Sequence, residues 1–407
     1  MQLSSDDLPM FFAEAHLRLA EALRGQAQAI AEVEWLAGTE AARDAAAVAA
    51  LARAGLFAQV APASGVVDAR ALCLCREMLG YVSPRADSIF AVQGLGVHPI
   101  LLAGSAAQRA MVPAFAAGQQ VAAFALTEPE AGSDVAAIAT TARADGDGYV
   151  LDGEKLFISN LGVAGFATVF AQVRGEPAAG AAGRTLSAFW LPLTTPGVTV
   201  TAQTAIAAHP IGALTLRAVR VPADARIGAV GEGFALAMRT LDAFRVSVGA
   251  AAVGMARRAL DEALAHVTTR VQFGKPLAEQ PLVAAHLADC AVDLDAARLL
   301  VLRAAAARDA GAGRAATSAV SIAKLGATEA AQRVIDRAVQ LFGGRGVMAG
   351  AVVETLYRAI RPLRIYEGTS EIQRTIIGRA LAAAPPTGLA ALHPPPRTPG
   401  GPTEDLP

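Results

Sequence analysis

Glu367 is a carboxylate in a position that suits acid–base chemistry. It lies in Tyr366-Glu367-Gly368, directly before an expected helix. Ser370 and Gln373 have the spacing of a capping box, and apolar residues at helical intervals follow them. In this turn the carboxylate is either solvated beside the positive end of the helix or accepts a proton from a bound molecule. The turn alone does not decide between these two roles.

The segment FALTEPEAGSD (124–134) combines a short apolar run with a polar loop that contains glycine. The amides and hydroxyls at Thr127, Gly132 and Ser133 are suited to hold a phosphate or the edge of a heterocycle. The plainer interpretation is a β-turn whose polar side chains cap its own backbone. Both interpretations stay open at this point.

A second segment, GEKLFISN (153–160), pairs an aromatic ring with a hydroxyl group. Side chains two residues apart on a strand share a face, so we expect Phe157 and Ser159 to lie together. A flat ligand could stack on the ring and form a hydrogen bond with the hydroxyl. Ordinary packing of the sheet would produce the same pattern.

Common nucleotide-binding and hydrolase motifs are absent from the sequence. Gly94-x-Gly96 leads into His98-Pro99, and there is no Walker loop, no His-Glu-x-x-His and no Gly-x-Ser-x-Gly. The six histidines are scattered, and Cys73 and Cys75 are too close together for an ordinary zinc pair. We therefore predict no metal site.

The first part of the chain has the residue spacing of helices. The pattern is clearest in 41–56 and 68–80, which consist of good helix formers. Gly55 and Gly80 stand where C-terminal helix caps are expected. These helices extend to about residue 120.

From about residue 121 to 233 the pattern becomes that of strands and turns. The strands are expected at 187–192, 197–202 and 213–222. Asp147-Gly148 and Asp152-Gly153 are typical of hairpin turns. A β domain is therefore predicted between two helical regions.

Long helical patterns return at 245–267, 282–310 and 316–342, and a fourth helix is expected after Ser370. Long helices with short connections predict a bundle. From residue 385 to the end, eight prolines in 23 residues predict an unpacked tail.

These patterns predict an α+β protein with three domains and a tail. We expect an N-terminal all-α domain, a middle β-barrel or sandwich domain, a C-terminal four-helix bundle and a proline-rich tail, with boundaries at 1–121, 122–233, 234–383 and 384–407.

Composition limits the classes of partner. The chain has 407 residues, 54% of them hydrophobic, and 35 basic against 36 acidic residues, a balance that argues against nucleic-acid binding. Three cysteines fit a reducing compartment, and MQLSSDDLPM at the start lacks the features of a signal peptide. No uninterrupted apolar run of 18 residues is present, so no membrane span and a cytoplasmic location are expected.

Four strings, in this order and spacing, resemble the acyl-CoA dehydrogenase family: TEPEAGSD, RVQFGKP, QLFGGRG and IYEGTSEIQR. The likeness covers about residues 10 to 382. The fold of that family is a helical domain, a β domain and a four-helix bundle, which agrees with the organisation predicted from periodicity. The resemblance implies an FAD enzyme that acts on an acyl-CoA and passes electrons to an electron-transfer flavoprotein. It also implies a homotetramer, or at least a dimer, in which a neighbouring subunit completes the site.

The resemblance implies roles for individual residues. Positions that match cofactor contacts within one subunit are Leu126, Thr127, Ser133, Phe157, Ser159, Thr369 and Glu371. Positions that match contacts with the adenosine end of the FAD of a neighbouring subunit are Arg270, Phe273, Gln340, Gly343 and Gly344. Positions that match substrate contacts are Ser133, Asp242, Arg245, Gly368 and Arg379.

In this family the glutamate that matches Glu367 is the catalytic base. The resemblance implies that it removes the α-proton of the thioester while flavin N5 takes the β-hydride, which gives a trans-2-enoyl-CoA. Hydrogen bonds to the thioester carbonyl must stabilise the developing enolate, and desolvation must raise the pKa of the carboxylate. Some members carry the base on a bundle helix, but Ala243 and Phe244 occupy those positions here and cannot accept a proton.

The segment FAVQGLGVHPILLAGS (90–105) is similar to the glutaryl-CoA branch of the family. That branch uses an arginine for the distal carboxylate of its substrate, and Asp87 matches that position here. A decarboxylating enzyme for a dicarboxyl-CoA is therefore disfavoured.

Two other functions are considered. The first is another flavin enzyme on the same scaffold, an acyl-CoA oxidase or a monooxygenase. Glu367 argues against a monooxygenase, which does not need this base, whereas no motif separates an oxidase from a dehydrogenase. The second is a non-catalytic homologous subunit, against which the intact YEGTSEIQR argues. The yellow colour of bound flavin would separate these classes.

Overall fold

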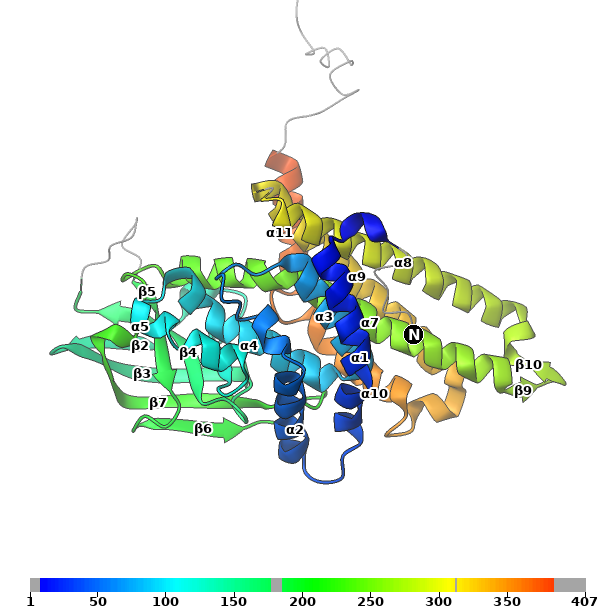
Figure 1. Ribbon diagram of the computed structural model, residues 1–407, viewed down its shortest axis with the longest axis horizontal. Coiled ribbons are helices and arrows are strands. Elements are labelled where there is room, and N and C mark those ends of the chain that lie inside the picture. Colours follow the sequence, from blue (N-terminus) through cyan, green and yellow to red (C-terminus); the bar gives the residue numbers. More distant parts are fainter. Residues whose placement is uncertain (1–7, 177–184, 312, 384–407) are drawn as a thin grey trace, which may run out of the picture.

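The computed structural model describes residues 8–176, 185–311 and 313–383, so the predicted tail at 384–407 lies outside the described residues. Figure 1 shows the sheet at one end of the molecule and the long helices extending away from it. The predicted α+β class, with helices first, strands in the middle and long helices last, is confirmed.

The N-terminal region consists of helices, several of which start at a side-chain cap. Asp68 accepts a hydrogen bond from Ala71 N (2.9 Å), and Ser83 accepts one from Ala86 N (3.1 Å) ahead of Pro84, which suits a first helical position. The helices are α1 (Glu14–Ala31), α2 (Glu40–Arg53), α3 (Ala69–Val82), α4 (Pro84–Ala103), α5 (Ala106–Arg109) and α6 (Val112–Ala116).

Gly55 follows α2 in a left-handed conformation, with φ of 66°, as expected of a C-terminal cap. The same prediction for Gly80 was wrong, because this glycine lies inside α3. A Cβ atom there would lie 2.3 Å from the carbonyl oxygen of Ala251 on α7 (Gly233–Thr269). Gly80 therefore serves the close packing of two helices and not the end of one.

The middle region is a mixed sheet with the strand order β6-β7-β3-β2-β4-β5-β8, and β1 pairs with β4. The hairpin predicted at Asp147-Gly148 joins β2 to β3, but Asp152-Gly153 lies inside β3 at a shift of register against β7. The strands are β1 (Ala122–Ala125), β2 (Thr141–Asp145), β3 (Gly148–Ser159), β4 (Phe166–Arg174), β5 (Leu186–Pro192), β6 (Val198–Ala202), β7 (Ile211–Pro222) and β8 (Arg226–Ile227).

The C-terminal region contains the longest helices. A small hairpin, which the sequence did not predict, joins α7 to α8 at the end of the molecule that lies opposite the sheet (Figure 1). The elements are α7 (Gly233–Thr269), β9 (Val271–Gln272), β10 (Lys275–Pro276), α8 (Pro281–Asp309), α9 (Gly313–Phe342), α10 (Val352–Ile360) and α11 (Ser370–Ala383).

Helix α4 joins the helical and β regions, since it packs against both α7 and β1. In the described part of the chain it is the one helix long and apolar enough to cross a membrane, but 78% of its apolar window is buried inside the protein. Burial of this kind is expected of a core helix.

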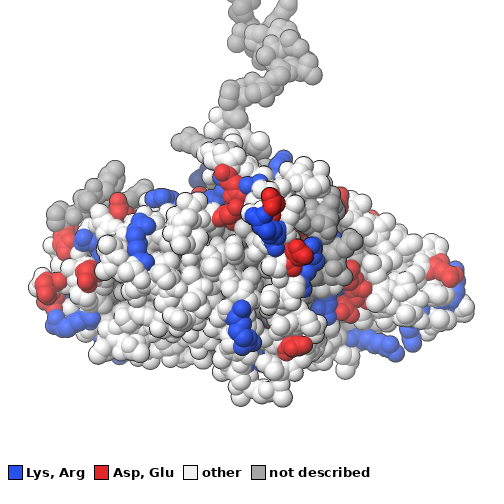
Figure 2. Space-filling model, in the orientation of Figure 1, with Lys and Arg blue, Asp and Glu red and all other residues white. Residues whose placement is uncertain are grey.

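One face of the molecule carries few charges (Figure 2). Figure 2 shows acidic and basic side chains close together on one face, within a largely uncharged surface. Ion pairs such as Arg337 with Asp293 (2.8 Å) contribute to this mixture of signs elsewhere in the structure.

Candidate active site

Glu367 lies in a strained turn between α10 and α11. Its backbone has φ of 53°, a left-handed conformation that is uncommon for a residue with a long side chain. Its side chain is only 5% exposed, which excludes the solvated carboxylate considered from the sequence. The helix that follows is capped by Thr369, whose Oγ1 accepts a hydrogen bond from Ile372 N (3.3 Å), so the cap predicted at Ser370 was wrong by one residue.

Three side chains from three helices hold the backbone of this turn. Arg245 Nε donates to the carbonyl oxygen of Glu367 (3.1 Å), and Lys324 Nζ donates to that of Gly368 (2.7 Å). Gln373 Nε2 donates to the same oxygen of Gly368 (3.0 Å). The left-handed conformation costs about 1–3 kcal/mol, and these contacts are what can maintain it.

The carboxylate of Glu367 is buried close to cationic side chains. Burial raises its pKa, and the positive charges of Arg76, Arg245 and Lys324 oppose that rise. Arg76 Nη1 lies 3.9 Å from Oε1, whereas no donor from the described residues reaches Oε2. One oxygen atom is therefore free to accept a proton.

Arg76 is, like Lys324, a site residue that the sequence did not predict. Its guanidinium is fully buried and forms a bidentate pair with Asp87, with Nε to Oδ1 and Nη2 to Oδ2 both at 2.8 Å. Nη1 donates to Ser247 Oγ (3.1 Å). The signal available in the sequence was a charged residue in the apolar run of 71–79, but its partner Asp87 lies on the next helix and no spacing rule links the two.

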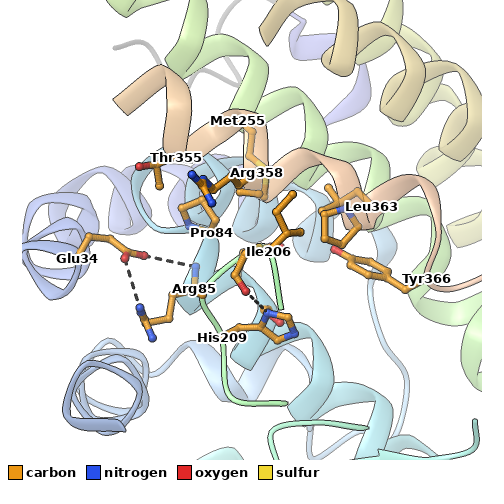
Figure 3. A pocket seen from close by; sticks show the side chains of 16 residues that line it. Glu34, Pro84, Arg85, Ile206, His209, Met255, Thr355, Arg358, Leu363 and Tyr366 are labelled. Atoms are coloured by element: carbon orange, nitrogen blue, oxygen red, sulfur yellow. Dashed lines mark hydrogen bonds and ion pairs between the residues drawn. The ribbon is translucent and has the colours of Figure 1, made fainter. Parts of the chain in front are cut away.

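A cavity of about 150 Å³ lies beside Asp87 of this pair, and Figure 3 shows Tyr366 at its wall. Asp87 and Tyr366 both line it, so it adjoins the residues next to the base. Figure 3 shows Met255 and Leu363 among its apolar lining, and Glu34 paired with Arg85 near its edge. The wall of the cavity therefore contains apolar side chains together with the charged side chains of Glu34, Arg85, Asp87 and Arg358.

The two middle segments with ligand-binding residue types lie side by side. Leu156 N donates to the carbonyl oxygen of Thr127 (2.9 Å). Thr127 and Ser159 are half-buried, and Ser133 is exposed. Leu126 is buried below them, with 8% of its surface exposed.

Phe157 has an unusual geometry for a residue in a strand. Its φ is 57°, its ring is 61% exposed, and β3 shifts register against β7 between Lys155 and Ile158. A β-bulge of this kind turns a side chain out of the regular sheet. The alternation of side chains along a regular strand does not predict this bulge. The bulge leaves the ring accessible to a flat ligand.

The residues that match adenosine contacts lie far from Glu367 in the same chain. Arg270, Gly343 and Gly344 line a cavity of about 540 Å³, and nothing lies within 4 Å of a Cβ built on either glycine. Phe273 is 96% exposed, and Gln340 is exposed as well. Because α7 has 37 residues, its two ends are about 55 Å apart, so one chain cannot bring this cavity to its own sheet.

A third cavity, of about 1070 Å³, lies near the start of α3 and α9 and is lined by Arg70, Arg239, Arg308 and Asp242 among others. Asp242 forms an ion pair with Arg245, which in turn holds the turn of the base. Arg379, which matches a substrate contact, is exposed on α11.

Metal ligands are not gathered in the part of the chain that the structure describes. No group of three His, Cys, Asp or Glu side chains is placed to hold an ion there. Cys73, Cys75 and Cys290 are buried and unpaired, and burial raises the pKa of each thiol.

Comparison with known proteins gives consistent matches. The family models for the middle and C-terminal domains of acyl-CoA dehydrogenases match residues 123–219 and 231–382. Over 287 residues, 70% of this chain and 68% of the relative, the sequence is 39% identical to the short-chain specific acyl-CoA dehydrogenase of human mitochondria.

The folds of solved structures match the fold of this chain over most of its length. Butyryl-CoA dehydrogenase from Megasphaera elsdenii has a TM-score of 0.81 and 30% identity, covering 91% of this chain and 99% of that one. An acyl-CoA dehydrogenase from Bacillus anthracis, complexed with FAD, has a TM-score of 0.82 and 28% identity, covering 91% and 67%.

Proposed function

This chain belongs to the acyl-CoA dehydrogenase family of FAD-dependent oxidoreductases, and from that premise we propose that Glu367 removes the α-proton of an acyl-CoA thioester. The observation that carries the proposal is a buried carboxylate with one oxygen free of any donor among the described residues. The product would be the trans-2-enoyl-CoA.

The environment of Glu367 supports a role as a base. An α-proton is too weakly acidic for a carboxylate in water, and burial raises the pKa of Glu367, which makes it a stronger base. The same shift predicts a pH dependence. The carboxylate must be ionised to act, so activity is lost as the pH falls through the raised pKa.

The residues fit the cofactor that the family requires. The exposed Phe157 and the half-buried Thr127 and Ser159 suit a flat heterocycle, and the exposed Ser133 suits a phosphate. We assign Leu126, Thr369 and Glu371 to the same site. When bound there, FAD supplies the acceptor for the hydride that leaves the β-carbon.

The adenosine end of FAD is assigned to a second subunit. Arg270 and Phe273 follow α7 at its far end, beside the open glycines Gly343 and Gly344. Since one chain cannot join this cavity to its own Phe157, we propose that two chains complete each FAD site. The active assembly would be at least a dimer, and a homotetramer by family likeness.

We assign the CoA part of the substrate to the third cavity. The arginines that line it, Arg70, Arg239 and Arg308, suit phosphate groups. Asp242 also lines this cavity and forms an ion pair with Arg245, which binds the backbone of Glu367. Arg379 and Gly368 are assigned to the same substrate by family likeness.

The acyl group is expected to be short. A cavity of about 150 Å³ has the volume to hold a molecule the size of benzene, so an acyl chain that ends in the cavity beside Tyr366 has room for only a few carbon atoms there. We expect butyryl-CoA or hexanoyl-CoA to reduce the flavin at least about 10-fold faster than palmitoyl-CoA. The measurement is anaerobic loss of flavin absorbance with a panel of acyl-CoA thioesters.

The panel also tests the function itself. Equal rates for short and long chains would contradict the assignment of this cavity, whereas no reduction by any acyl-CoA would contradict the proposed reaction. Admitting oxygen after reduction separates the alternatives. Slow reoxidation in air, together with fast reoxidation by an electron-transfer flavoprotein, is expected of a dehydrogenase, and fast formation of peroxide would indicate an oxidase.

A further inference from the structure

We propose that Arg76 is a positioning residue that keeps Glu367 in its ionised, proton-accepting form and that Asp87 tempers this effect. The inference rests on the proposed role of Glu367 as the base. It concerns a pair of side chains on α3 and α4 that lie outside the four strings shared with the family.

The geometry of Arg76 is that of a fixed charge. Two hydrogen bonds to Asp87 and one to Ser247 hold the guanidinium in place, and it has no exposed surface. Its Nη1 atom lies 3.9 Å from Glu367 Oε1. This is close enough for a strong charge interaction but beyond hydrogen-bond distance, so the charge is stabilised while the oxygen atoms stay available.

The other two cationic side chains near Glu367 donate hydrogen bonds to the backbone of the turn. Arg245 pairs with Asp242 and donates to the backbone of Glu367, and not to its carboxylate. Lys324 donates to the backbone of Gly368, and burial lowers its pKa to about 8, so it loses its charge in mildly alkaline solution. Arg76 cannot be deprotonated in this range.

Asp87 weakens the stabilisation that Arg76 gives to the negative charge of Glu367. Its carboxylate lies on the far side of the guanidinium and opposes the stabilisation of a second negative charge at Glu367. Tyr366, the remaining titratable side chain in contact with the group, stays neutral because burial raises its pKa. Burial is the largest influence on the pKa of Glu367. Arg76 is the largest of the charged neighbours that lower this pKa, and Asp87 raises it, so the two members of the pair act in opposite directions.

Because Arg76 and Asp87 act on the charge of Glu367 in opposite directions, variants of the two residues should shift the pH midpoint of the reaction differently. The double variant Arg76→Gln/Asp87→Asn keeps a hydrogen-bonded, neutral pair and removes the fixed charge. The pH midpoint of flavin reduction by butyryl-CoA should rise by about 1 unit, which slows the reaction about 10-fold on the acid side and leaves the alkaline plateau unchanged. Asp87→Asn alone should lower the midpoint. Arg76→Lys, which keeps the charge, should hold the midpoint near that of the wild type.

The measurement is anaerobic stopped-flow reduction of the FAD-loaded enzyme across pH. Infrared titration of Glu367, taken as the difference from a matched Glu367→Gln protein, gives a second reading that needs no turnover. If the double variant and the wild type share one midpoint, or if only the plateau falls, Arg76 does not hold the charge of the base. If the wild type is not reduced by any acyl-CoA, the proposed function fails and the infrared midpoints alone decide the role of Arg76.

Discussion

Replacing Glu367 with glutamine is expected to slow flavin reduction by an acyl-CoA by at least about 10²–10⁴-fold, the usual cost of losing a general base. Glutamine preserves the size of the side chain but cannot accept the α-proton. Arg245 and Lys324 bind backbone oxygens of the turn, so the turn should keep its shape. FAD content should match that of the wild type. The measurement is stopped-flow reduction with the best substrate of the panel.

A matched control is Glu21→Gln, which removes an exposed carboxylate on α1. It should reduce at the wild-type rate. A Glu367→Gln enzyme that reduces its flavin within a few-fold of the wild type would show that another group takes the proton. Loss of FAD from that variant would instead indicate that the carboxylate supports the cofactor site.

Replacing Arg270 with alanine is expected to weaken FAD binding by about 10–150-fold. A hydrogen bond that involves a charged group contributes about 1.5–3 kcal/mol, and each 1.4 kcal/mol changes affinity tenfold. Arg270 is exposed in the single chain and lines the open cavity beside Gly343 and Gly344. Its loss should therefore affect the cofactor more than the fold of the chain.

The measurement for Arg270→Ala is flavin retained after gel filtration, combined with molar mass from light scattering. Arg174→Ala, an exposed arginine at the end of β4, is the control and should retain its FAD. The shared FAD site also predicts that the protein without FAD forms a weaker assembly. A monomer with a full complement of tightly bound FAD would contradict the shared site.

Periodicity in the sequence was enough to predict the order of helices and strands. The helices predicted at 282–310 and 316–342 are observed at Pro281–Asp309 and Gly313–Phe342, because long runs of good helix formers leave few alternatives. Gly80 shows where such local reasoning fails. A glycine that ends a helix and one that admits a neighbouring helix look alike until the second helix, here α7, is placed.

The candidate site likewise contains residues that the sequence could identify and features that it could not. Glu367 could be identified because its string resembles a family motif, and Phe157 could be identified as a contact, but the bulge that turns its ring outward could not. Arg76 and Asp87 were missed as a pair because they meet only when α3 and α4 fold together. Charged groups that shift the pKa of a base are placed beside it by the packing of helices. Their spacing along the chain does not show that they are neighbours.

The central claim is that this chain oxidises an acyl-CoA to an enoyl-CoA with Glu367 as the base. Its most direct test is an anaerobic single turnover of the FAD-loaded enzyme with butyryl-CoA, analysed for products by mass spectrometry. We expect one trans-2-enoyl-CoA for each FAD reduced, and almost none from Glu367→Gln over the same time. An enzyme whose flavin is reduced by dithionite but which forms no enoyl-CoA from any acyl-CoA of the panel would contradict the claim.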